Sequence, residues 1–367
     1  MGPLTGVRIV EIASLAPGPF GAMLLADLGA EVIRVERSGG APAVEPPPGP
    51  LDRGRVSLSA DLKTPAGVQT VRALAARADV LIEGFRPGVA ERLGIGPDAL
   101  LELNPRLIYA RMTGYGQDGP LADQAGHDIN YAAIAGALEP LGRAGESPHP
   151  PLNLLADFAG GGSFLALGIV AALYERETSG RGQVIDAAMV DGASALMSFL
   201  HGMKAAGQWE GARGTNLLDG GAPFYDTFAT RDGKFMAVGS VEPQFYAQLL
   251  IGLGLGDREL SAQFDPAGWP DTRQLFAEVF ASRTRDEWTE RFAGLDACVT
   301  PVLSPWEAHE HPHHRARGSF VEVGGLRQPA PAPRFSRTPL DAPRPMDRSQ
   351  ETLDNTLAAW GVEGSSA

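Results

Sequence analysis

A histidine and an aspartate thirty positions apart are the residues of this sequence whose side chains are best suited to proton transfer. His127 stands between Gly126 and Asp128, and Asp157 shortly precedes three consecutive glycines. An imidazole exchanges a proton near neutral pH, and a carboxylate is a second common acid–base group. Placed on opposite sides of a carbon acid, one group would remove a proton and the other would return one. We therefore take His127 and Asp157 as the candidate catalytic pair.

Each of these residues also has a simpler interpretation. A histidine in a loop is often a surface residue, and Asp157 has the position of a helix N-cap. An aspartate at a helix N-terminus would lie beside free backbone N–H groups, which could stabilise an enolate oxygen. Glu242 precedes a predicted helix, so it is either a charge of the first turn or a carboxylate that orients His127.

Composition limits the classes of protein to consider. A chain of 367 residues is long enough for two domains, and its 44% hydrophobic and 20% charged residues are typical of a soluble globular protein. The net charge of −13 argues against nucleic-acid binding. The single cysteine, Cys298, predicts a reducing, cytoplasmic location. We find no signal peptide pattern and no apolar run long enough to cross a bilayer, so no membrane partner is expected.

The first half of the chain alternates strand and helix patterns, as in an α/β protein with a Rossmann-like sheet. The predicted strands, about four or five in number, are 7–12, 31–36, 56–59, 80–82 and 107–112. No G-x-G-x-x-G follows the first strand, so a bound dinucleotide is not expected. Ligands of such sheets bind beyond the carboxyl ends of the strands, where Arg37 and Arg86 stand. These arginines suggest a local anion site, although surface arginines are also common.

The later elements predict a second, smaller α+β domain. A helix is expected from 157 to 176 with Asp157 as its N-cap, then a strand at 184–190 and a helix at 193–206. Arg231-Asp232-Gly233 predicts a hairpin between strands 224–230 and 234–239. The expected division is a large domain at 1–190, to which 326–367 return, a linker helix at 191–219 and a small domain at 220–325. Residues 40–50 are expected to be a loop, and 326–345 a linker.

Four histidines near the end of the small domain invite a metal-site interpretation, namely His309, His311, His313 and His314. Their spacing fits no closed zinc site, and no cysteine accompanies them. Pro312 would interrupt a helix that aligned them. We expect an exposed loop and no metal.

Several segments, taken in order, resemble the family III CoA-transferase (CaiB/BaiF-like) family, and within it the bacterial α-methylacyl-CoA racemases. The resemblance covers nearly the whole chain. The matching segments are Leu4-Thr5-Gly6, Ala60-Asp61-Leu62-Lys63, Glu83-Gly84-Phe85-Arg86-Pro87-Gly88, Ala110-Arg111-Met112-Thr113-Gly114-Tyr115-Gly116-Gln117, Ala125-Gly126-His127-Asp128-Ile129-Asn130-Tyr131, Asp157-Phe158, Gly182-Gln183-Val184-Ile185-Asp186 and Asp219-Gly220-Gly221-Ala222-Pro223. Any one of these segments alone would be weak, but so many in one order are specific.

The resemblance implies a Rossmann-like large domain, a smaller α+β domain and an interlocked homodimer. It implies His127 and Asp157 as catalytic bases with Glu242 supporting His127, and an acyl-CoA substrate with no separate cofactor. The residues implied to contact the acyl-CoA are Arg37, Ala60, Asp61, Leu62, Lys63, Gly84, Phe85, Arg86, Arg92, Gly126, Asp128, Ile129, Asn130 and Tyr131.

The implied activity is inversion at C2 of 2-methyl-branched acyl-CoA thioesters through an enolate. The alternative is a CoA transferase, in which Asp157 would be a nucleophile that forms acyl-aspartate and aspartyl-CoA intermediates. His127 argues against it, because a transferase needs no second base there. A third possibility is an acyl-CoA-binding protein without activity.

Overall fold

The computed structural model describes residues 2–37 and 49–362, so most of the expected loop at 40–50 lies outside the described residues. The chain forms two compact units. Unit 1 contains residues 1–137, 151–196 and 313–367, and unit 2 contains residues 138–150 and 197–312. The expected small domain, 220–325, overlaps unit 2, and the expected linker helix, 191–219, is divided between the units.

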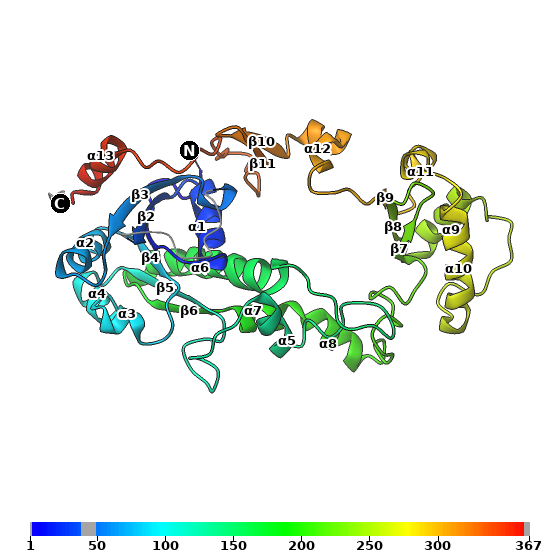
Figure 1. The fold of residues 1–367 in the computed structure, drawn as a ribbon, viewed down its shortest axis with the longest axis horizontal. Helices are drawn as coiled ribbons and strands as arrows, with labels where there is room; N and C mark the ends of the chain where they lie inside the picture. Colours follow the sequence, from blue (N-terminus) through cyan, green and yellow to red (C-terminus); the bar gives the residue numbers. More distant parts are fainter. Residues whose placement is uncertain (1, 38–48, 363–367) are drawn as a thin grey trace. The chain divides into compact units, whose positions relative to one another are not determined.

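Unit 1 is built on a six-stranded parallel sheet with the strand order β3-β2-β1-β4-β5-β6 (Figure 1). The sixth strand lies within the strand expected at 184–190. The order reverses between β1 and β4, which is where ligands bind in open α/β sheets. Its strands are β1 (Arg8–Ile12), β2 (Glu31–Arg37), β3 (Arg55–Ala60), β4 (Val80–Glu83), β5 (Ile108–Thr113) and β6 (Val184–Ala188).

The central strands are nearly continuous runs of Val, Ile and Leu because helices bury both faces of the sheet. Val10 of β1 pairs with Ile33 of β2 on one side and with Leu81 of β4 on the other. All three side chains are completely buried. The helices of this part are α1 (Pro17–Asp27), α2 (Pro65–Ala75), α3 (Val89–Arg92), α4 (Pro97–Leu103), α5 (Asp128–Ile134), α6 (Ser163–Ser179), α7 (Met189–Leu196) and α13 (Gln350–Trp360). The Thr64 side chain caps α2, since it accepts a hydrogen bond from the amide of Gly67.

The prediction that Asp157 caps a helix is wrong. A π-helix, η2 (Leu154–Gly162), precedes α6 without a break, and its N-cap is Asn153. Asp157 lies inside this π-helix.

The continuous helix Leu154–Ser179 is long and apolar enough to cross a membrane by length and composition, which corrects the expectation that no such run exists. It packs against α1 and against β5 and β6, so packing within unit 1 accounts for its buried apolar residues.

Two glycines of η2 let other backbone segments approach closely. A Cβ on Gly160 would lie 2.6 Å from the amide nitrogen of Ala193, and one on Gly162 would lie 2.6 Å from the carbonyl oxygen of Pro17. Glycine is therefore required here so that η2 can pack against α7 and α1, which explains residues that are otherwise unfavourable in a helix.

The single helix expected at 193–206 is two helices, α7 and α8 (Ser198–Ala205), divided at Met197. In unit 2 the predicted hairpin is confirmed: β7 (Tyr225–Ala229) and β8 (Phe235–Gly239) are antiparallel, and β9 (Val299–Pro301) completes the sheet. The helices α9 (Pro243–Leu253), α10 (Trp269–Phe280) and α11 (Arg285–Phe292) supply apolar side chains to an aromatic core around Phe276 and Trp288.

Two expectations for the last part of the chain are corrected. Pro312 does not prevent a helix but begins one, α12 (Pro312–Arg317), because proline is favourable in the first turn. The expected linker 326–345 contains a strand, β11 (Leu326–Pro329), which pairs with β10 (Phe320–Val323). The short 3-10 helices are η1 (Pro50–Asp52), η3 (Pro266–Gly268) and η4 (Ala308–Glu310).

Candidate functional site

The carboxyl edge of the sheet brings together most residues of the predicted acyl-CoA set. Arg37 and Ala60 are register partners at the ends of β2 and β3, so Asp61, Leu62 and Lys63 follow directly beside Arg37. Lys63 is exposed, and its amide donates to the Asp61 carboxylate across 3.0 Å. Two cationic residues thus stand at the ends of neighbouring strands on one edge of the sheet, which suits an anionic ligand.

The loops that follow β1 and β4 meet at the point where the strand order reverses. A Cβ on Gly84 would lie 3.0 Å from the Cβ of Ser14, so a larger residue at position 84 would push the two loops apart. Gly84, Phe85 and Arg86 form the loop after β4. Arg92 is the last residue of α3, the short helix that follows this loop.

A buried carboxylate holds this loop in place. Glu83, at the end of β4, accepts a hydrogen bond from the amide of Phe85 across 2.6 Å. Its other oxygen accepts from Nε of Arg111 on β5 across 3.0 Å. Glu83 is completely buried, and burial raises the pKa of its carboxyl to about 7, against the lowering effect of the Phe85 amide and of Arg111.

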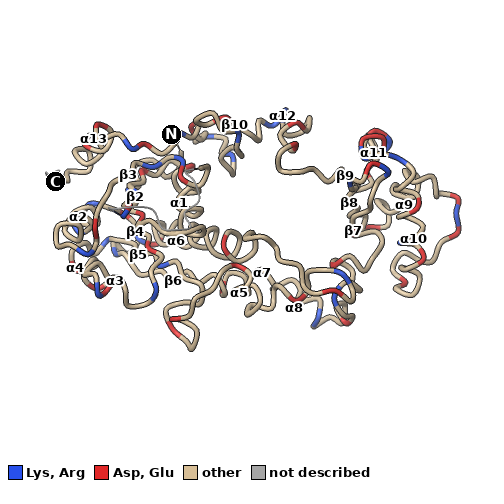
Figure 2. Tube along the Cα trace, in the orientation of Figure 1, with Lys and Arg blue, Asp and Glu red and all other residues tan. Residues whose placement is uncertain are grey.

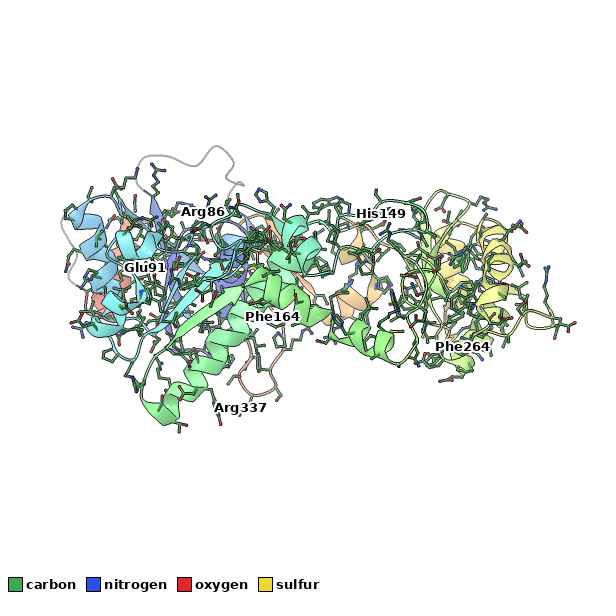
Figure 3. The ribbon with its side chains drawn as sticks, turned by 90° about the horizontal axis from the view of Figure 1, so that it is seen from below. Arg86, Glu91, His149, Phe164, Phe264 and Arg337 are labelled. Atoms are coloured by element: carbon green, nitrogen blue, oxygen red, sulfur yellow. The ribbon has the colours of Figure 1, made fainter. Side chains whose placement is uncertain are left out.

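Arg111 extends the network to α3, because its Nη1 donates to the carboxylate of Glu91 across 2.8 Å. Figure 3 labels Arg86 and Glu91, which belong to this segment. Sequence reasoning missed Glu83 and Arg111 as supports of the loop. The available signal was a glutamate at the end of the apolar run Val80-Leu81-Ile82, where a charge is buried only if it has partners.

His127 is the N-cap of α5, and it is exposed. Its backbone amide donates to Oδ1 of Asn130 across 3.1 Å, which fixes the start of the helix. The hydroxyl of Tyr131 donates to the carbonyl oxygen of Gly126 across 2.5 Å. A Cβ on Gly126 would lie 2.6 Å from the Tyr131 ring, so the residue before His127 is glycine for steric reasons. Tyr131 thereby supports the turn that presents the imidazole.

Asp128 connects the histidine segment to the aspartate segment. Its Oδ2 accepts hydrogen bonds from the amides of Ala156, across 2.7 Å, and of Asp157, across 2.8 Å. Asp128, the residue next to His127, is thus hydrogen-bonded to residues that lie 28 and 29 positions later in the chain. Sequence reasoning grouped Asp128 with the acyl-CoA contacts, whereas in the structure its buried carboxylate is directed to backbone amides.

The environment of Asp157 favours its protonated form. Burial raises the pKa of the Asp157 carboxyl to about 6, the charge of Asp128 adds to the shift, and His127 and Asn153 oppose it. A carboxyl group that titrates near neutral pH can both donate and accept a proton there. His127 and Asp157 are therefore close enough to interact electrostatically, as two groups that share a reaction centre must be.

Backbone donors are available beside His127. The amides of Asp128 and Ile129 open α5 and have no carbonyl partner in a preceding turn, whereas those of Asn130 and Tyr131 donate to the His127 carbonyl. The amides of Ala156 and Asp157 already donate to Asp128. Donors for an enolate oxygen are thus found at the start of α5 rather than at the start of the helix that contains Asp157.

Glu242 belongs to unit 2, where it is the exposed N-cap of α9 and its side chain makes no capping hydrogen bond.

Burial raises the pKa of the Cys298 thiol, and the charges of Asp296 and Glu242 add to the shift. A raised pKa leaves the thiol protonated near neutral pH, so Cys298 is not set up as a nucleophile.

A cavity of about 550 Å³ lies within unit 2 beside β7 and β8. Asp226, on its wall, forms ion pairs with Arg143, across 2.6 Å, and with Arg273. Leu218 and Tyr225 contribute to the same wall.

Acidic and basic residues are interspersed along both units (Figure 2). Within the described ranges no group of three or more His, Cys, Asp and Glu side chains is placed to bind a metal ion.

Comparisons with known proteins agree with this arrangement. The model of the family described as CoA-transferase family III matches residues 4–347. Alpha-methylacyl-CoA racemases of Mus musculus and Homo sapiens are 56% and 52% identical over 337 residues, and each alignment covers 92% of this chain and 87% of the relative. A crystal structure of a CAIB/BAIF family protein from Brucella suis aligns with a TM-score of 0.84 at 27% identity, over 98% of this chain and 99% of that one. The family predicted from the motifs is confirmed, and the chain belongs to CoA-transferase family III.

Proposed function

We propose that this protein is a racemase that inverts C2 of 2-methyl-branched acyl-CoA thioesters. The observation that carries the proposal is the hydrogen bond from the amide of Asp157 to the Asp128 carboxylate, which connects the aspartate segment to the residue next to His127. The racemase relatives from mouse and human, each more than half identical to this chain, support the same activity.

The reaction requires two groups that exchange protons with one carbon. In one direction His127 accepts the C2 proton while protonated Asp157 donates a proton to the opposite face, and in the reverse direction the two groups exchange roles. The pKa of about 6 for Asp157 lets both of its protonation states occur near neutral pH. One proton is removed and one is returned, so the substrate keeps its composition and changes only its configuration.

The intermediate is an enolate, whose oxygen requires stabilisation because the α-proton of a thioester is far less acidic than either catalytic group. The first amides of α5, those of Asp128 and Ile129, are the proposed donors to this oxygen. Preorganised backbone donors of this kind contribute about 3 to 4 kcal/mol to stabilising a transition state. The proposed reaction uses no cofactor, since coenzyme A is part of the substrate.

The basic residues at the carboxyl edge of the sheet are proposed to bind the CoA moiety. Arg37 is the last residue of β2, and Lys63 lies shortly after β3. Arg86 precedes α3, and Arg92 is the last residue of that helix. A guanidinium binds phosphate through paired hydrogen bonds. The rest of the proposed acyl-CoA contacts are Ala60, Asp61, Leu62, Gly84, Phe85, Gly126, Ile129, Asn130 and Tyr131.

The proposal includes a cytoplasmic homodimer of two interlocked chains. Helix α6 carries the exposed apolar side chains Leu167, Val170 and Tyr174, with 63%, 37% and 82% of their surface accessible. A contiguous apolar surface of this kind supports burial against another protein surface. Glu242 is proposed to orient the imidazole of His127 in this assembly. Light scattering on the purified protein tests the dimer, and a monomeric mass would contradict it.

The CoA-transferase alternative uses Asp157 as a nucleophile. It gives His127 no role, and it requires an acceptor acid and ping-pong kinetics. An acyl-CoA-binding protein without activity would bind the thioester and leave C2 unchanged. The racemase accounts for both titratable residues and for the raised pKa of Asp157.

Separate substitutions of the two bases test the proposal. His127→Ala and Asp157→Ala, each incubated with the two enantiomers of a 2-methylacyl-CoA, are expected to lose about 10²- to 10⁴-fold in racemisation rate. The matched controls are His201→Ala on α8 and Asp123→Ala in an exposed loop, which are expected to keep the wild-type rate. A variant of His127 or Asp157 that racemises normally would contradict the proposed roles.

A further inference from the structure

We infer that Asp128 is a positioning residue that sets both the place and the protonation of the Asp157 side chain. The inference rests on the proposed function, because it assigns a task to a residue that supports one of the two proposed bases. It concerns a carboxylate that reaches no substrate itself but determines how its neighbour presents a proton.

The contacts of Asp128 show how the positioning works. Its Oδ2 accepts from two consecutive amides, Ala156 and Asp157, at 2.7 and 2.8 Å. These amides lie in the first turn of η2, where helix N–H groups have no carbonyl partner within the helix. A side chain from another helix therefore supplies the acceptor that the turn lacks. The acceptor thus lies at the start of a π-helix, a conformation that is rare outside single turns.

Burial makes the arrangement sensitive to charge. Asp128 is 3% exposed, and within the described residues its Oδ1 has no hydrogen-bond partner. A buried carboxylate with one unpaired oxygen is unfavourable, and its field is poorly screened. A neutral asparagine at this position would also supply an acceptor oxygen for the amides of Ala156 and Asp157. The negative charge therefore has a separate consequence, which falls on the nearest titratable group.

That group is Asp157. The charge of Asp128 raises the pKa of the Asp157 carboxyl, in the same direction as the larger effect of burial, while His127 and Asn153 lower it. Tyr131 of α5 also interacts electrostatically with Asp157. The other helices packed on η2 carry Asp27, Asp191, Glu175, Arg176 and Glu177. Of these, Asp27 is paired with Arg53 and Arg176 with Asp79. Asp128 is thus the acidic neighbour whose charge adds to the effect of burial on the Asp157 carboxyl.

The adjacent residues His127 and Asp128 therefore have different roles in the proposed reaction. His127 exchanges protons with the substrate, and Asp128, one position later, fixes the backbone of Asp157 and holds its carboxyl group partly protonated near neutral pH. A single short segment therefore carries one proposed base and influences the position and the charge state of the other.

The variant Asp128→Asn separates the two tasks, because asparagine keeps an acceptor oxygen for the amides and removes the charge. We expect the limb of the kcat pH profile that depends on Asp157 to shift to lower pH by roughly half a unit or more. KM is expected to change less than about twofold. Asp123→Asn removes the same charge from an exposed loop and is expected to leave the profile unchanged. A uniform loss of kcat with an unmoved profile would show a merely structural role and would overturn the inference.

A titration without catalysis distinguishes this inference from the proposed function. The midpoint of Asp157 is followed by carbon NMR of labelled carboxyl groups, with the signal assigned through its loss in Asp157→Asn. We expect the midpoint to fall in Asp128→Asn and to stay in Asp123→Asn. A lowered midpoint in a protein that never exchanges the C2 proton would reject the racemase and keep the positioning role. An unchanged midpoint in an active enzyme would reject the positioning role alone. Circular dichroism confirms that each variant is folded.

Discussion

Arg111 donates a hydrogen bond from its Nε to the carboxylate of Glu83 across 3.0 Å, and both side chains are buried behind the loop that carries Arg86. The pair connects β4 and β5 to α3, since Arg111 also donates to Glu91. Removing Glu83 leaves the buried Arg111 with only its partner on α3, the partly exposed Glu91, which is more harmful than losing a surface ion pair.

The variant Glu83→Gln is therefore expected to weaken acyl-CoA binding. Glutamine can still accept from the Phe85 amide, but it no longer neutralises Arg111, so the loop holding Arg86 shifts. We predict that KM for the acyl-CoA rises about tenfold, equivalent to about 1.4 kcal/mol, with a smaller change in kcat. Steady-state kinetics measure both constants. Glu102→Gln, on the exposed side of α4, serves as the control, and an unchanged KM in Glu83→Gln would contradict the role of the pair.

Arg86 offers a test of where coenzyme A binds. If its guanidinium contacts a phosphate of the nucleotide, Arg86→Ala raises KM for the acyl-CoA but not for the matching pantetheine thioester, which lacks the nucleotide. The expected increase is about tenfold or more, since a charge-assisted hydrogen bond contributes about 1.5 to 3 kcal/mol. Equal increases for the two substrates would place Arg86 away from the nucleotide.

The close approach of η2 to α7 predicts a strong effect of small substitutions. A Cβ on Gly192 would lie 1.8 Å from the carbonyl oxygen of Gly160, an impossible contact between two backbones. Gly192→Ala is expected to destabilise the fold by about 1 to 3 kcal/mol through overpacking. A Cβ on Gly202 of α8 would meet no heavy atom of the described residues within 4 Å, so Gly202→Ala should be neutral or stabilising. Urea denaturation compares the two, and equal stabilities would contradict the packing.

The raised pKa of Asp157 predicts how stability depends on pH. Its folded value of about 6 exceeds the ordinary 3.8, so between these values the native state retains a proton that the unfolded state has released. The contribution of Asp157 to stability is thus fully present below the unfolded pKa and is lost as pH rises through the folded pKa. Asp157→Asn should remove this loss.

Thermal or urea unfolding measures this contribution. We expect Asp157→Asn to be more stable than wild type by about 1 to 2 kcal/mol near pH 8, and to show little difference near pH 4, after allowance for solvent screening. A difference that was the same at both pH values would mean that the substitution changes packing rather than ionisation.

The sequence predicted the parts of this protein that depend on local patterns. Buried strands such as Val80–Glu83 are short apolar runs between turn signals, and the hairpin at Arg231-Asp232-Gly233 has a strong local signature. The motif around His127 identified the family, although no periodicity would have shown that this histidine caps a helix.

What sequence reasoning missed depends on contacts between distant residues. An aspartate followed by a helical pattern is typical of an N-cap, which is why Asp157 was predicted to be one. In the structure the helix begins at Leu154, and the amide of Asp157 donates a hydrogen bond to the Asp128 carboxylate. The break at Met197 between α7 and α8 has no glycine or proline to mark it. For Asp157 a tertiary contact overrides a local preference.

The central claim is that C2 of the substrate exchanges its proton through His127 and Asp157. The most direct measurement incubates the wild-type protein with one enantiomer of a 2-methylacyl-CoA in deuterium oxide, without any acceptor acid, and follows C2 by mass spectrometry and NMR. We predict deuterium at C2 together with the appearance of the opposite enantiomer, and neither in His127→Ala or Asp157→Ala. A thioester that stays undeuterated and optically pure, or that changes only when an acceptor acid is added, would contradict the account.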